Sequence, residues 1–119
     1  MMTLRAGQRL RRTGEFRAVR EQGRRMDCGA FLLNWRVRSP EEPAAAARVG
    51  VVASKASVGN AVQRARAKRR LRELYRRHQS LVPPNVDLVM TARRALLVID
   101  FAAATQRFVQ ACGKLVPHA

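Results

Sequence analysis

Cationic side chains gather in one stretch of this chain. Residues 55–77 contain nine Lys or Arg and a single acid, Glu73, in a protein of 119 residues whose net charge is +16. Of its 24 cationic residues only three are Lys. Guanidinium groups bind phosphate oxygens through paired hydrogen bonds and stack on bases. The chemistry that this stretch predicts is recognition of a polyanion, and nucleic acid is the partner that it favours.

Hydrolytic or metal chemistry on the protein has little support in the sequence. The only adjacent acids, Glu41 and Glu42, lie in a Pro-rich loop, and no acids have the spacing of a two-metal site. His78 continues an apolar stripe and suits packing better than general-base catalysis. Cys28 and Cys112 occur without a Cys/His cluster, so we expect no metal site and two unpaired thiols, with a single disulfide as the alternative.

A strand, a turn and a helix must position the cationic stretch. Residues 48–54 lack apolar–polar alternation, which predicts a central strand covered on both faces. A Ser-Val-Gly-Asn turn follows, and residues 60–78 then form a helix without Gly or Pro. At helical spacing, one apolar stripe faces the core while most cations and Val62 lie elsewhere. The stripe consists of Ala67, Leu71, Leu74 and Tyr75.

The remaining chain supplies the rest of one domain. We expect residues 1–12 to be a flexible basic segment and residues 13–119 a single domain. Thr13 is the expected N-cap of a helix that ends at Gly23.

A strand over residues 26–38 follows that helix, another is expected over residues 86–92, and a last helix begins after Asp100. In the strand over 26–38, alternation predicts a core face and a polar face that meets solvent or RNA. The core face consists of Phe31, Leu33, Trp35 and Val37, and the polar face of Leu32, Asn34, Arg36 and Arg38.

The expected fold is α+β, a single-domain α-β-β-α-β-α sandwich of helices on a small sheet. No apolar run approaches the roughly 18 residues that a membrane helix needs, and the N-terminus lacks the apolar core of a signal peptide. We therefore expect a cytoplasmic protein with no membrane partner.

The order of residues in the cationic stretch is more specific than its charge. After Ser54-Lys55 the chain reads Gly59-Asn-Ala-Val-Gln-Arg-Ala-Arg-Ala-Lys-Arg-Arg-Leu-Arg-Glu73. This run resembles the protein subunit of bacterial ribonuclease P, and the resemblance extends over nearly the whole chain. Ala65 stands where the family motif has Asn, and Ala56 where a second Lys is frequent. Arg20 and Asn34 replace frequent aromatic residues.

The resemblance implies a division of labour. A large RNA subunit, using Mg²⁺, cleaves precursor tRNA, while one protein per RNA binds that catalytic RNA and the single-stranded 5′ leader. It also implies a mixed sheet with a left-handed β-α-β crossover and a ribosomal-protein-like fold, where general rules favour a right-handed one. The catalytic RNA would contact Asn60, Arg64, Arg66, Lys68, Arg69 and Arg72. The leader cleft would be lined by Phe16, Asn34, Val52 and Lys55.

Other readings of the chain differ in the partner or in the reaction. Composition alone favours a structural RNA-binding protein, such as a small ribosomal protein, and the motif from Gly59 to Glu73 argues against it. A DNA-binding module would place a helix and turn before its recognition helix, whereas a strand precedes this one, so no DNA partner is expected. A self-sufficient nuclease would need the missing constellation of acids.

Overall fold

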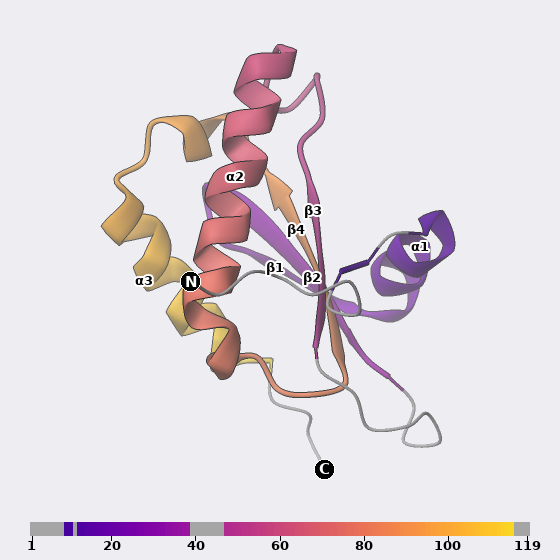
Figure 1. Cartoon of the computed structure of the whole chain (residues 1–119). Coiled ribbons are helices and arrows are strands. Elements are labelled where there is room, and N and C mark those ends of the chain that lie inside the picture. The colour runs from indigo at the N-terminus through magenta and orange to yellow at the C-terminus, as the bar shows by residue number, and fades with distance from the viewer. Residues whose placement is uncertain (1–8, 11, 39–46, 116–119) are drawn as a thin grey trace.

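The computed structural model describes residues 9–10, 12–38 and 47–115. Its elements in chain order are α1 (Thr13–Gln22), β1 (Arg24–Asp27), β2 (Phe31–Val37), β3 (Arg48–Val52), α2 (Ala61–His78), the 3-10 helix η2 (Gln79–Leu81), β4 (Val86–Ala92), the 3-10 helix η3 (Arg94–Leu97) and α3 (Phe101–Cys112). The four strands form one mixed sheet in the order β1-β2-β4-β3. Helix α1 covers one face and helices α2 and α3 cover the other (Figure 1). The predicted α+β sandwich is confirmed.

The connection from β3 through α2 to β4 joins neighbouring parallel strands. In Figure 1 the chain runs up β3, down α2 and up β4, with the left-handed sense that the resemblance implies. The expectation of an α-β-β-α-β-α order is wrong by one strand, because β1 precedes β2 in an antiparallel hairpin. Residues 26–38 are therefore not one strand.

The hairpin turn has a local cause. Gly29 adopts a φ of 82°, a left-handed conformation in which glycine is favoured. The Asp27 carboxylate accepts a hydrogen bond from the Gly29 amide at 2.8 Å, and this bond competes with strand pairing. The end of β4 stabilises the same turn, because Arg93 donates to both carboxylate oxygens of Asp27 at 2.7 and 3.0 Å.

Strand β3 is an edge strand and not the central strand that its sequence predicted. Strand β4 lies between β2 and β3, and all of its residues except Thr91 are buried. The apolar, non-alternating sequence of β3 follows from cover on both faces. Val49 and Val51 pack in the main core, and on the other face the ring of Phe16 lies on Gly50, where an added Cβ would be 2.4 Å from a ring carbon. The loop between β2 and β3 therefore joins antiparallel strands that are not neighbours, and its residues 39–46 lie outside the described part of the chain.

The main core lies between the sheet and helices α2 and α3. The predicted stripe of α2 (Ala67, Leu71, Leu74 and Tyr75) is buried, and His78 extends it by packing its ring 6.2 Å from that of Phe108. The predicted core face of β2 is buried through Trp35, but Val37 is 41% exposed. Val37 is the last residue of β2 and lines a surface groove beside Gly23. From the predicted polar face, Arg38 is buried.

A buried carboxylate explains why Arg38 is buried. Asp87 in β4 is 1% exposed and lies in register between Arg36 of β2 and Arg48 of β3. Arg48 donates to both of its oxygens at 2.8 and 2.7 Å, and Arg38 donates to one at 3.1 Å. Arg48 also donates to Glu15 of α1 at 2.7 Å. One carboxylate thus links three strands, and through Arg48 it holds α1 against the sheet.

The start of α1 differs from prediction by one residue. Arg12 is the N-cap and Thr13 is the first helical residue. The Glu15 carboxylate accepts a hydrogen bond from the Arg12 amide at 3.0 Å, as in a capping box. Gly23 ends the helix as predicted, and a side chain there would collide with the carbonyl oxygens of Val19 and Trp35.

We predict that Asp87→Asn lowers the free energy of unfolding by about 3–5 kcal/mol, because Arg38 would keep a buried charge without a carboxylate and Arg48 would lose its bidentate partner. Urea denaturation monitored by circular dichroism measures this loss. Asp27→Asn is the matched control, since it removes a carboxylate paired with Arg93 at the surface and should cost far less. Equal losses in the two variants would contradict the structural role of Asp87.

The core also predicts sensitivity to high pH. Burial raises the pKa of the Cys112 thiol and of the Tyr75 hydroxyl to about 12, from ordinary values of 9.0 and 10.0. Above pH 9 the unfolded chain therefore holds fewer protons at these groups than the folded chain, so stability falls as pH rises toward about 12. We expect urea midpoints to decrease across this window, and Tyr75→Phe to flatten the decrease above pH 10. A parallel decrease in the variant would contradict the assignment to Tyr75.

Candidate nucleic-acid interface

The turn before α2 sets where the cationic helix begins. The Asn60 side chain accepts a hydrogen bond from the Gln63 amide, and the Gln63 side chain accepts one from the Asn60 amide, each at 2.9 Å. These two bonds satisfy backbone amides at the start of α2, which have no partner within the helix. Gly59 has a φ of 134°, and Val58 is fully buried. The helix is regular from Ala61, so the exposure of Val62 comes from its position on the outer side and not from a distorted first turn.

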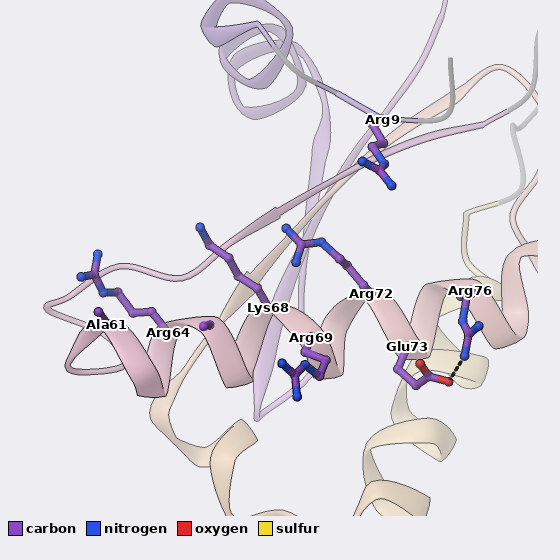
Figure 2. Close-up of a pocket in the computed structure, with 9 residues that line it drawn as sticks. Arg9, Ala61, Arg64, Lys68, Arg69, Arg72, Glu73 and Arg76 are labelled. Atoms are coloured by element: carbon purple, nitrogen blue, oxygen red, sulfur yellow. Dashed lines mark hydrogen bonds and ion pairs between the residues drawn. The ribbon is translucent and has the colours of Figure 1, made fainter. Parts of the chain in front are cut away.

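A groove of about 580 Å³ runs along one flank of α2 (Figure 2). It is lined by Arg9, Ala61, Arg64, Ala65, Lys68, Arg69, Arg72, Glu73 and Arg76. Six of these nine residues are Lys or Arg. Small alanines in the lining leave space for a ligand to approach the helix closely. The groove therefore suits an elongated polyanion.

The one acid among the described residues that line the groove, Glu73, is already paired. Glu73 accepts hydrogen bonds from Arg76 and Arg77, and these bonds hold the pKa of its carboxyl below the ordinary value. Both partners lie at the C-terminal end of α2, where cations also interact favourably with the helix dipole. The cations nearer the N-terminal end keep their net charge for a ligand.

The opposite flank of α2 packs against the chain. Arg70 donates to the Ile99 carbonyl at 2.8 Å, and the guanidiniums of Arg70 and Arg77 lie 5.6 and 5.3 Å from the ring centroid of Phe101. These contacts attach the segment before α3 to α2. The helix therefore has one flank used for packing and one that lines an open groove.

The six residues predicted to meet the catalytic RNA divide between these places. Four of them, Arg64, Lys68, Arg69 and Arg72, line the groove. Asn60 is the N-cap, and Arg66 is exposed but not among the described residues that line the groove. The resemblance implies that all six residues contact the catalytic RNA, whereas the structure places four of them in one groove.

The predicted leader-cleft residues lie mainly on the other face of the sheet. Phe16 and Val52 pack beside Val89, and Asn34 is the register partner of Val89 in the neighbouring strand. These side chains share the face that α1 covers. Lys55 is exposed in the turn after β3, beyond the end of the strand. Phe16 is half-buried, so it contributes to packing while keeping part of its ring accessible.

Two cations that line the groove, Arg9 and Arg76, were not among the predicted RNA contacts. Arg9 was missed because it falls in the segment predicted to be flexible. Leu10, an apolar residue in a basic segment, was the local sign of an anchor. Of residues 1–12 the structure describes 9, 10 and 12, and the domain boundary remains a prediction.

Among the described residues, no group of three or more His, Cys, Asp or Glu side chains is arranged to hold a metal ion. No helix in this part of the chain is long and apolar enough to cross a membrane.

Comparison with known proteins decides the family. The family model described as Ribonuclease P matches residues 4–116. The chain belongs to the ribonuclease P protein family. The ribonuclease P protein component of Desulfovibrio desulfuricans is 35% identical over 112 residues, which cover 92% of this chain and 84% of that protein. The component of Streptomyces avermitilis is 40% identical over 115 residues, covering 85% and 91%.

Solved structures of ribonuclease P proteins have the same fold. The protein from Thermotoga maritima has a TM-score of 0.77 at 23% identity and covers 92% of this chain and 98% of its own. The Staphylococcus aureus protein has a TM-score of 0.73 at 23% identity, with coverage of 91% and 96%. Family membership makes the chain a protein component of ribonuclease P and assigns it to tRNA processing.

The cations of α2 that the resemblance assigns to the catalytic RNA give a testable prediction. We expect Arg64→Ala and Arg66→Ala each to weaken binding to ribonuclease P RNA several-fold and to lower the slope of log affinity against log salt by about 1. Filter binding at four salt concentrations measures both quantities. Lys114→Ala removes an exposed cation just after α3 and is the charge-matched control. It should change the affinity and the salt slope little. Unchanged slopes in both α2 variants would exclude this helix from the interface.

Proposed function

We propose that the chain is the ribonuclease P subunit that binds the catalytic RNA through α2 and the 5′ leader of precursor tRNA on the α1 face of the sheet. In this way it assists endonucleolytic removal of the leader, which yields the mature 5′ end. The observation that carries the proposal is the groove along α2, where six cations from one helix and the N-terminal segment face one space. One protein per catalytic RNA completes the proposed assembly.

The cleavage chemistry belongs in this proposal to the RNA subunit and its Mg²⁺ ions. Four of the described acids have structural uses that support this division. Asp87 and Glu15 are bound by Arg48, Asp27 by Arg93, and Glu73 by Arg76 and Arg77. A carboxylate engaged by guanidinium groups is poorly suited to hold a catalytic metal ion. The protein residues therefore bind and orient RNA.

Binding through α2 gives affinity without a choice of sequence. Each phosphate that an arginine neutralises releases counterions, and this release favours association at low salt. Guanidinium groups in the groove would also reduce repulsion between the catalytic RNA and other phosphates brought near it. The proposed contacts are those of Asn60, Arg64, Arg66, Lys68, Arg69 and Arg72.

The α1 face suits a leader whose sequence differs among tRNA precursors. It combines the partly exposed ring of Phe16 with the half-buried side chains of Asn34 and Val52. Stacking and van der Waals contacts of this kind tolerate any base. Lys55 stands at the end of the face and supplies a charge for the leader phosphates.

A structural RNA-binding protein is the second candidate function, because the same α2 groove would serve it equally well. The two functions differ in one measurable consequence. Only a ribonuclease P subunit changes the rate at which the catalytic RNA cleaves precursor tRNA.

We predict that the purified protein increases cleavage of precursor tRNA by ribonuclease P RNA at low Mg²⁺, and that it cleaves nothing alone. Gel analysis of 5′-labelled precursor under single-turnover conditions measures the rate. Lys55→Ala should lose part of the stimulation for a precursor with a long leader and none for one with a single-nucleotide leader. Failure of the wild-type protein to stimulate, or cleavage by the protein alone, would contradict the proposed function.

A further inference from the structure

The groove on α2 has a wall that comes from outside the helix. Arg9 pairs with Val49 in a parallel bridge on the outer edge of β3, and the Leu10 amide donates to the Val49 carbonyl at 2.9 Å. The Leu10 side chain is buried beside Val19 and Val89. The backbone at residues 9–10 is thus held by the sheet, while the exposed Arg9 side chain lines the groove.

A row of cations on α2 faces this wall. Arg64, Lys68 and Arg72 are spaced by four residues, so they form one line along the helix with a rise of about 6 Å between neighbours. Figure 2 shows the three side chains extending to the side of α2 on which Arg9 lies. Because like charges on two walls of one groove repel each other, the arrangement complements an anion that lies between them.

We propose that this groove holds one single-stranded segment of the catalytic RNA, gripped between Arg9 and the row formed by Arg64, Lys68 and Arg72. The proposal rests on the proposed function and adds the N-terminal segment to the RNA-binding site. Cations on both sides of a narrow space surround a single backbone, which is how charged grooves bind single strands. A flat or convex cationic face would instead suit a duplex.

The residues that line the groove indicate which part of the RNA strand lies in it. None of the described residues that line the groove is aromatic, so bases have no stacking partner there. Alanines at positions 61 and 65 leave room beside the helix. The sugar–phosphate backbone therefore lies in the groove, and binding there is independent of sequence.

The position of the groove favours the catalytic RNA over the leader. None of the four predicted leader residues is among the described residues that line it. Phe16 and Val52 lie on the α1 face, whereas the groove belongs to α2, which covers the opposite face (Figure 1). The two RNA partners would then occupy different sides of β3.

A double-mutant cycle tests whether Arg9 and α2 grip the same strand. Binding of fluorescent full-length catalytic RNA is measured by anisotropy at four salt concentrations for Arg9→Ala, Arg72→Ala and the double variant. We expect each single variant to weaken binding several-fold and to lower the salt slope by about 0.7, the value for a single-strand phosphate. The fold loss of affinity in the double variant should be smaller than the product of the two single fold losses, because a strand released at one wall is held poorly at the other.

Two controls separate charge from position and from folding. Lys114→Ala removes the same charge at an exposed position just after α3. The fold losses of affinity in Lys114→Ala and Arg9→Ala should multiply when the two substitutions are combined. Arg9→Lys keeps the charge and should recover the salt slope. Thermal melting should change little in Arg9→Ala, because the substitution keeps the backbone bridge to Val49 and the buried Leu10 side chain.

Three results would overturn the proposal. The first is an Arg9→Ala variant that behaves like Lys114→Ala. The second is full multiplication of the Arg9 and Arg72 losses. The third is weaker binding of a fluorescent leader oligonucleotide by Arg9→Ala with binding of the catalytic RNA unaffected. Stimulation of cleavage by the wild-type protein is recorded in the same preparation. If stimulation is absent but the Arg9 and Arg72 losses are coupled, the proposed function fails and the grip of the groove on RNA stands.

Discussion

The buried carboxylate of Asp87 is the interaction on which the arrangement of this fold depends. It lies on the central strand, in register with arginines of both neighbouring strands, and Arg48 extends the contact to Glu15 of α1. A buried charge of this kind is stable only when its partners are in place. Assembly of β2, β3, β4 and α1 is therefore linked, and so is the alignment of the α1 face with the edge of β3 that carries residues 9 and 10.

The pairing of acids with arginine matters in this chain because arginine is in large excess. With a net charge of +16, self-repulsion opposes a compact chain. The described acids in contact with guanidinium groups lie where the fold needs attachment: at the centre of the sheet, at the β1–β2 turn and at the C-terminal end of α2. Within α2, the pairing of Glu73 with Arg76 and Arg77 leaves the net positive charge toward the N-terminal end of the helix. Charge pairing thus supports the fold and also determines where a polyanion is attracted.

Local patterns in the sequence predicted local structure, and the elements set by distant contacts were missed. The stripe of α2 follows from helical spacing alone, so Ala67 and Leu71 were assigned to the core correctly. The order of the strands does not follow from any such period. Strand β3 resembles a central strand because both of its faces are covered. Val49 packs in the main core, and Phe16, which is far away in the chain, lies on Gly50. The hairpin at Gly29 depends on a side-chain hydrogen bond that alternation cannot reveal. For the candidate site, the motif pointed to the arginines of α2, while Arg9 joins them through a bridge to β3.

In the proposed complex, the two flanks of α2 determine the direction from which RNA approaches. Arg70 and Arg77 lie over Phe101, and Arg70 also binds a backbone carbonyl, so these cations are engaged in holding the segment before α3. The cations on the groove side face an open space that the outer edge of β3 bounds. Ala65 lies in that space where the family motif has Asn, and its methyl group offers no hydrogen bond to a base or sugar. If RNA binds in this groove as proposed, recognition depends there on charge and on the distance between its two walls. Such a site would select the backbone of RNA, and selection among RNAs would come from shape over a larger surface.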